Sequence, residues 1–254
     1  MATPREINRH MKSVGNIGKI TKAMKMVAAA RLRRAQEKAA ASRPYAIKIK
    51  EVLSNVVSDP SVLAGLDAKK HPLLQKREVQ KVGYLVLCSD KGLAGAYSSN
   101  ALKKAIAEIS ECEDEVVIIT CGRKARDFFT RRGFNVIQSH IGFSDRPTYE
   151  NAVAIAQDAI KTFASEGFDK LNIVYTIFKT ALSQIPTSEV ILPVEPPAKE
   201  NDKAQASFMF EPGEDETLKV LAPKYLETVV YAALVQSAAS ELGSRMTAMS
   251  SATD

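Results

Sequence analysis

The sequence predicts an α/β fold in which two long terminal helices form an antiparallel coiled coil, with a Rossmann-like α/β domain between them. Two observations lead to this prediction. Both ends of the 254-residue chain carry long stretches in which apolar and small residues recur with a helical period. Between these ends, short apolar runs alternate with helical patterns, which is typical of a parallel sheet with right-handed crossovers.

The first segment, 1–58, is expected to be one coiled-coil helix that begins near Pro4. Proline is tolerated in the first helical turn, whereas Pro44 is expected to kink or interrupt the helix because it removes an internal hydrogen bond. Apolar residues recur at steps of four and three, which indicates a coiled-coil seam rather than a broad globular face. The expected seam residues are Ile7, Met11, Val14, Ile20, Met24 and Val27, and Tyr45, Ile49, Val52 and Val56 continue the pattern.

The middle of the chain, 78–200, is expected to form the α/β domain after a loop-like stretch at 59–80. Its first two strands are continuous apolar runs, which are typical of parallel strands buried on both faces. The expected strands are 82–88, 116–121, 135–138, 171–178 and 189–192, and the expected helices are 98–109, 124–132 and 149–165.

The last segment, 210–254, is expected to be the second coiled-coil helix and to pack against the first. It is expected to begin near Asp215, or just after Pro223, which lies about two turns further along and is disfavoured inside a helix. Small residues at 237–240 permit close packing of a partner helix. The expected seam residues on this side are Val229, Met246 and Met249.

The positive charge of the chain belongs to its first helix. Residues 1–50 contain 13 Lys and Arg and two acidic residues, a net charge of +11, whereas the remainder contains 22 basic and 27 acidic residues, a net charge of −5. Such a segment should seek an acidic partner surface. A partner protein is favoured; a solvated face and nucleic acid remain alternatives, although no aromatic interleaving or recognised nucleic-acid motif accompanies the basic residues.

Candidate catalytic and ligand-binding residues are sparse. The stretch 89–95, SDKGLAG, connects a strand to a helix, where phosphate loops occur, but it matches neither the dinucleotide fingerprint nor the P-loop pattern. A tight turn that needs glycine is therefore favoured over a nucleotide site. Asp90, Lys91, Asp145 and Arg146 are loop charges without a nucleophile, a base and an orienting group.

Neither the histidines nor the cysteines form a metal-binding pattern. His10, His71 and His140 are widely separated, and only His140, which follows a strand, could be catalytic. Cys88, Cys112 and Cys121 lack metal spacing and are expected to be buried, inert thiols in a reducing compartment. No catalytic residue, metal or cofactor is expected.

No apolar stretch approaches the roughly 20 residues that span a bilayer, and no secretory signal is present, so a cytoplasmic protein is expected.

Three stretches resemble one known family. Residues 16–29, NIGKITKAMKMVAA, resemble the N-terminal helix signature of the γ subunits of F-type, rotary ATP synthases. Residues 88–100, CSDKGLAGAYSSN, are similar to the strand–turn–helix motif of that family, and residues 240–249, SELGSRMTAM, to its C-terminal helix motif. The motifs occur in the family's order and extend over the whole chain.

The resemblance implies the central rotor shaft of an ATP synthase, without catalysis or a cofactor of its own. Such a shaft rotates inside a ring of three α and three β subunits, couples ion flow to ATP synthesis or hydrolysis and regulates the catalytic sites. The α/β domain would lie against the ε subunit and the ring of c subunits. Membrane association would occur only through the complex, at the cytoplasmic face of a bacterial plasma membrane, and nucleic acid would not be a partner. The residues expected to contact the β subunit are Lys19, Lys22, Lys25, Arg31, Arg33, Arg34 and Arg245.

The sequence also departs from the family. Members usually continue in helix beyond the region that ends here at Asp254, so the resemblance implies a shortened C-terminal helix. The cysteine-bearing regulatory insertion of chloroplast members is absent. Two other classes of protein make different predictions: a dinucleotide-binding enzyme needs a fingerprint loop, and a nucleic-acid binder shows strongly salt-dependent affinity. Neither class explains two coiled-coil helices at opposite ends of the chain.

Overall fold

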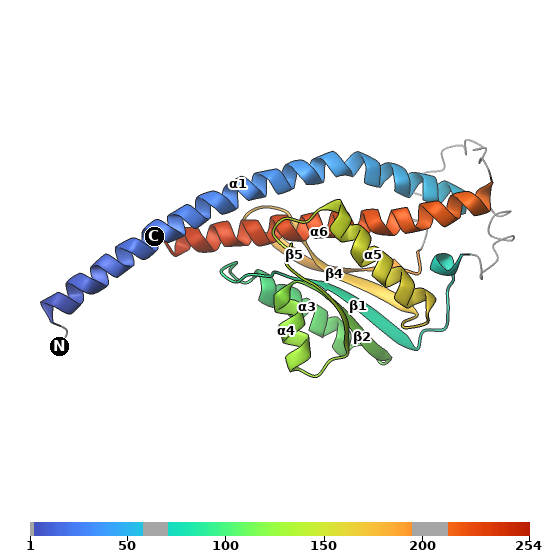
Figure 1. The fold of residues 1–254 in the computed structure, drawn as a ribbon, viewed down its shortest axis with the longest axis horizontal. Coiled ribbons are helices and arrows are strands. Elements are labelled where there is room, and N and C mark those ends of the chain that lie inside the picture. The colour runs from blue at the N-terminus through green and yellow to red at the C-terminus, as the bar shows by residue number, and fades with distance from the viewer. Residues whose placement is uncertain (1–2, 58–70, 195–212) are drawn as a thin grey trace.

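Two long helices lie side by side and form a rod along one side of an α/β sheet structure (Figure 1). The computed structural model describes residues 3–57, 71–194 and 213–254. The rod consists of α1 (Pro4–Val57) and α6 (Glu214–Ser251). Near the C-terminus the hydroxyls of Thr21 and Thr253 are 2.7 Å apart. At the other end, Ile49 and Leu221 line the same groove, so the two helices run antiparallel, as predicted.

Both helices continue through a proline, so the expected interruption at Pro44 does not occur. The helix α6 begins at Glu214, which agrees with the expected start near Asp215 and not with the alternative start after Pro223. A proline removes one backbone hydrogen bond and frees the carbonyl of the residue four positions earlier. Pro44 and Ala40 are exposed, so that carbonyl can be solvated. The packing of long helices on each other offsets the loss of a single bond.

The sheet contains five strands in the order β3-β2-β1-β4-β5. The first four in this order are parallel, and β5 is antiparallel to β4. The strands are β1 (Lys81–Leu87), β2 (Glu115–Cys121), β3 (Val136–His140), β4 (Lys170–Phe178) and β5 (Gln184–Leu192). The strand β5 begins five residues before the predicted start at Glu189, because Gln184 already pairs with Phe178 across a hairpin.

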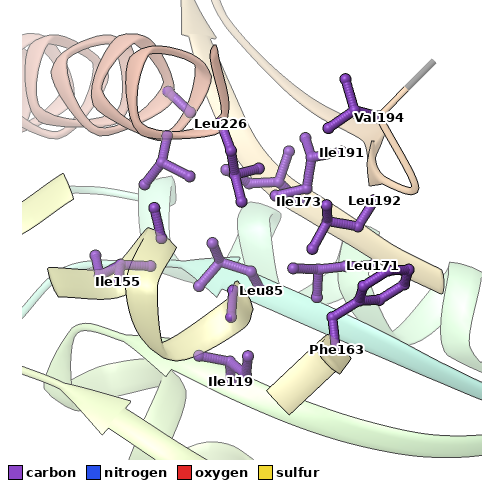
Figure 2. Close-up of a cluster of buried hydrophobic side chains, with 14 of the residues drawn as sticks. Leu85, Ile119, Ile155, Phe163, Leu171, Ile173, Ile191, Leu192, Val194 and Leu226 are labelled. Carbon is purple, nitrogen blue, oxygen red and sulfur yellow. The ribbon is translucent and has the colours of Figure 1, made fainter. Parts of the chain in front are cut away.

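Helices cover both faces of the sheet. The elements are the short 3-10 helix η1 (Pro72–Leu74), α3 (Tyr97–Ser110), α4 (Arg123–Arg131) and α5 (Tyr149–Ala164). On one face, α3 and α4 pack through residues such as Leu102 and Phe129. On the other face, α5 and α6 pack through Ile155, Phe163 and Leu226, which Figure 2 shows in one cluster with the strand residues. The helix α6 therefore contributes to the sheet core as well as to the rod.

One glycine at the end of β2 is required by its surroundings. Gly122 has a φ of +100°, and a Cβ at this position would lie 2.2 Å from the carbonyl oxygen of Cys88. Only a residue without a side chain can occupy such a site. This close approach brings the carboxyl ends of β1 and β2 together, where the loops described below meet.

Among the described residues, no helix combines the length and apolarity needed to cross a membrane.

Candidate functional site

The loops after β1 and β3 meet at a carboxylate at the rod side of the sheet. The carboxylate of Asp90 accepts backbone N–H bonds from Arg123 at 3.0 Å, Gly142 at 2.9 Å and Ser144 at 3.0 Å. Burial opposes ionisation, but these three donors outweigh it and hold the pKa of Asp90 below its ordinary value. Asp90 therefore connects the ends of three strands as a charged hydrogen-bond acceptor. Because its carboxylate oxygens are occupied by these backbone N–H groups, its role is structural.

The helix α6 is bonded to the loop 89–95, which here is a tight turn rather than an open phosphate loop. Arg245 donates to the carbonyl of Gly92 at 3.2 Å and to Glu241 at 2.7 Å, and the hydroxyl of Ser244 donates to the carbonyl of Ala94 at 2.7 Å. Burial raises the pKa of Glu241, and the charge of Arg245 opposes that rise. These bonds bring two of the three family-like motifs into direct contact.

The helix α1 is attached to the loop after β3. The guanidinium of Arg31 pairs with the carboxylate of Asp145, and the Nζ atom of Lys91 lies 3.5 Å from the same carboxylate. The Nζ atom of Lys38 donates to the carbonyl of Pro147 at 3.5 Å. We call the set of contacts made by Asp90, Asp145, Glu241 and Arg245 the junction, because it connects both rod helices to the sheet.

Most of the residues expected to contact a partner lie on the outer surface of α1. The exposed members are Lys19, Lys22, Lys25, Arg33 and Arg34. Lys25 donates to Ser250 of α6 at 2.9 Å, and Arg33 pairs with Glu37 at 3.1 Å on the helix surface. Exposed pairs of this kind contribute little to stability, so these charges remain available to a partner.

Two expected contact residues are placed differently. The side chain of Arg245 is only 9% exposed, and its charge is used inside the chain by Glu241 and Gly92. The side chain of Arg31 is 29% exposed and is paired with Asp145. The expectation for Arg245 as a surface contact is thus corrected: a guanidinium beside a buried carboxylate is retained there, because leaving that carboxylate unpaired would be costly.

The seam of α1 also differs from the prediction. Ile20 and Val27 are 59% and 50% exposed, whereas Thr21, Ala28 and Leu32 are buried. Met24, which belongs to both series, is half-buried. Around these positions the helix is therefore rotated by about one residue from the expected orientation, because Leu32 packs against Ala239 and Leu242 of α6. Further along α1, Ile49 is buried and Val52 is half-buried, as the predicted pattern requires.

The ends of the predicted seam behave differently on the two helices. Ile7, Met11 and Val14 are exposed, since no described segment lies beside that part of α1 (Figure 1). On α6, Met249 is buried, and Met246 packs against the cluster around Leu32. Val229 packs against the sheet core.

The structure brings together few groups suited to chemistry. Among the described residues, no three metal-binding side chains lie close together. His140 has its pKa lowered by burial, while Asp158, 3.7 Å away, opposes that effect. Burial raises the pKa of Cys88 to about 11, so this thiol is unreactive near neutral pH. The expectation of full burial is wrong for Cys112, which is partly exposed.

Sequence comparison matches residues 3–254 to a family model described as ATP synthase. The ATP synthase gamma chain of Brevibacillus brevis is 47% identical over 253 residues, which covers 98% of this chain and 86% of that protein. The ATP synthase gamma chain of Desulfitobacterium hafniense is 42% identical over 254 residues, which covers 100% of this chain and 87% of that protein.

Solved structures agree in fold. A chain from the central stalk and c-ring of the Tetrahymena thermophila mitochondrial ATP synthase has a TM-score of 0.67 at 23% identity, covering 92% of this chain and 100% of that chain. A chain from the rotor of the Euglena gracilis mitochondrial ATP synthase has a TM-score of 0.58 at 15% identity, covering 97% and 89%. Since the chain is 47% and 42% identical to these bacterial relatives and covers 86% and 87% of their length, it belongs to the ATP synthase gamma-chain family, whose members are non-catalytic stalk subunits.

Proposed function

We propose that this chain is the central rotor shaft of an ATP synthase and transmits torque between a membrane sector and the catalytic subunits. In this proposal the rod of α1 and α6 rotates inside a ring of α and β subunits. Each angle of an asymmetric rod stabilises a different conformation of a given β subunit, which changes the relative free energies of its nucleotide-bound states. The catalytic chemistry belongs to those partners.

The observation that carries the proposal is the junction. A shaft can transmit torque only if the rod does not turn independently of the sheet domain to which it is attached. In this chain both rod helices are bonded to loops of the sheet. Arg31 on α1 pairs with Asp145, and Arg245 and Ser244 on α6 bond to the loop 89–95. In addition, α6 shares the hydrophobic core of the sheet through residues such as Leu226. A force applied to the sheet is therefore transferred to the rod through several directed contacts.

The exposed basic surface of α1 supports contact with acidic β-subunit segments. Lys19, Lys22 and Lys25 lie on successive turns and are all exposed. Their attraction to carboxylates falls only gradually with distance at low salt, so it can act while the rod turns past its partners. We propose that these lysines, with Arg33 and Arg34, are the β-facing contacts.

The remaining partners follow from the same assignment. We propose that the chain divides into a first rod helix (1–58), a sheet domain (78–200) and a second rod helix (210–254), of which residues 1–2, 58, 195–200 and 210–212 lie outside the described residues. The sheet domain would contact the ε subunit and the c-subunit ring. The chain would then associate with the cytoplasmic face of a bacterial plasma membrane only through the complex. The gamma chains of Brevibacillus brevis and Desulfitobacterium hafniense, both bacterial relatives, support this assignment.

The test is reconstitution of the full chain with purified α and β subunits. The expected product is a complex with one copy of this chain per three α and three β subunits, and with a higher ATPase rate than α and β alone. The triple variant K19E/K22E/K25E is expected to assemble more weakly and to stimulate the ATPase at least several-fold less, because each reversal replaces an attraction with a repulsion.

The matched control is K103E/K124E/K161E, which makes the same change in charge at exposed lysines of the sheet domain. It should retain assembly and stimulation, since no α or β contact is proposed there. Equal effects of the two triple variants would contradict the assignment of the basic α1 surface. Absence of any complex with the unmodified chain would contradict the shaft proposal itself.

A further inference from the structure

A cavity of about 280 Å³ lies where α1 and α6 meet the loop before α5. Four cationic side chains line it: Arg31, Arg34, Lys38 and Arg146. One carboxylate, that of Asp145, is also in the lining. The cations come from two separate parts of the chain, the helix α1 and the loop after β3, so the fold brings together charges that a local sequence pattern does not.

The charges in this cavity are not balanced within the described structure. Asp145 is already paired with Arg31 and with Lys91. The Nζ atom of Lys38 bonds only to a neutral carbonyl, that of Pro147. Neither Arg34 nor Arg146 makes an ion pair with any described residue. Two guanidinium groups and one ammonium group thus lie beside a single cavity without an ion pair to any described carboxylate.

The surroundings strengthen this positive potential. The helix α5 begins directly after the loop, and its first turn is closed by a capping box between Thr148 and Asn151, so the positive end of its dipole lies near the cavity. Glu150 in the same turn is exposed, and its pKa is lowered by a hydrogen bond from Thr148 and by the charge of Lys38. Because its carboxylate interacts with Lys38, Glu150 can compete with a ligand for this cation.

The rest of the lining is apolar. Ala35 of α1, Val235 and Ala238 of α6, and Pro147 of the loop contribute to the wall. An apolar wall beside a charged group lowers the local effective dielectric and strengthens its electrostatic interactions. The cavity is small beside typical drug-sized pockets, which suits a compact anion rather than an extended polymer.

We propose that this cavity binds a phosphate group, either as free phosphate or as part of a nucleotide. A phosphate offers several acceptor oxygens and two negative charges, which match two guanidinium forks and one ammonium group. Arg34 and Arg146 would make charge-assisted bonds to its oxygens, and Lys38 would contribute a third positive charge. The site lies within a single chain and does not depend on the proposed shaft function. Arg34 is also proposed above as a β-facing contact, so phosphate and the β subunit would compete for its guanidinium group.

The test is isothermal titration of the full chain in phosphate-free buffer with inorganic phosphate, ADP and adenosine. Saturable binding of one phosphate per chain is expected, with no binding of adenosine. Tighter binding of ADP than of phosphate would identify a nucleotide as the source of the group, and equal affinities would identify free phosphate. Absence of saturable binding of both anions at millimolar concentration would overturn the proposal.

Three variants locate the site. R34Q and R146Q should each weaken phosphate binding by about tenfold, because each loses a charged hydrogen bond. E150Q should strengthen it by about twofold, because a competing carboxylate is removed. Since all three residues are exposed, the thermal unfolding of each variant should stay close to that of the unmodified chain.

The matched control is R33Q. It removes the same charge from the residue before Arg34 in α1, and Arg33 is not part of the cavity lining. It should bind phosphate as the unmodified chain does. If R33Q weakened binding as much as R146Q, phosphate affinity would depend on the overall charge of α1 and not on the cavity. That result would overturn the assignment of the cavity.

Discussion

Asp90 shows at the scale of a single residue how a loop charge can be structural. Its carboxylate accepts three backbone N–H bonds, from Arg123, Gly142 and Ser144. An asparagine has the same shape, but its amide nitrogen is a donor and would face another donor. The carboxylate can therefore be replaced by an amide only with the loss of at least one of these bonds.

We predict that D90N lowers the free energy of unfolding by about 2 to 3 kcal/mol at pH 7, the scale of a lost hydrogen bond to a charged group. The pKa of Asp90 is lowered in the folded state. Its stabilising contribution is therefore present above the unfolded carboxyl pKa of about 4 and is lost as pH falls through the lower folded pKa. The difference between D90N and the unmodified chain should thus shrink below about pH 4, as measured by urea unfolding across pH.

Asp127 provides the control for this prediction. Its pKa is also lowered, by a hydrogen bond from Arg126, but the pair lies on the surface of α4. D127N should therefore unfold with nearly the same stability as the unmodified chain at every pH. A pH-independent difference for D90N, or an equal loss in both variants, would contradict the proposed role of the Asp90 carboxylate.

At the scale of an element, α1 contains two overlapping apolar series. One runs through Ile20, Met24 and Val27 in steps of four and three, and the other through Met24, Ala28 and Leu32 in steps of four. Both place their residues on one face of a helix, so helical periodicity alone does not choose between them. The structure buries the second series, in which Leu32 packs against Ala239 and Leu242 of α6.

We predict that L32A lowers the free energy of unfolding by about 2 to 4 kcal/mol, because it removes buried methyl groups and leaves a cavity between the helices. V27A should change it by less than about 0.5 kcal/mol, because Val27 is half-exposed and faces away from α6. Chemical denaturation of the two variants gives both values. A larger loss in V27A than in L32A would show that the originally expected seam is the correct one.

At the scale of the whole molecule, the junction couples the rod to the sheet. Asp145 is paired with Arg31 of α1 and with Lys91 of the loop after β1. We predict that D145N makes the backbone amides of α1 near Arg31 exchange about threefold to tenfold faster. The reason is that loss of the ion pair lowers the free energy of local opening of this part of the helix. Hydrogen exchange of the buried strands β1 and β2 should remain unchanged. Mass spectrometry of exchanged peptides resolves these regions.

The control for D145N is D114N, at an exposed position in the turn before β2. It should leave the exchange of both α1 and the sheet as in the unmodified chain. Faster exchange throughout the sheet in D145N would indicate global destabilisation rather than uncoupling of the rod. Unchanged exchange in α1 would show that the Arg31 pair does not contribute to the junction.

The sequence by itself determined the elements that depend on local patterns. Continuous apolar runs predicted the buried strands β1 and β2, and helical periodicity predicted α1 and α6 at opposite ends of the chain. Three short motifs also pointed to the family that the comparisons then showed. These signals are readable because backbone conformation and the alternation of apolar residues are encoded within a few turns or pleats.

Only the tertiary structure decided which face of α1 is buried and which charges remain free. Arg245 belongs to a sequence motif that suggested a surface contact, yet it is buried beside Glu241. Arg34 and Arg146, far apart in the sequence, line one cavity. The physical reason is that burial and pairing depend on neighbours from distant segments. A helical period limits the possible faces, but the shape and charge of the packed partner select one of them.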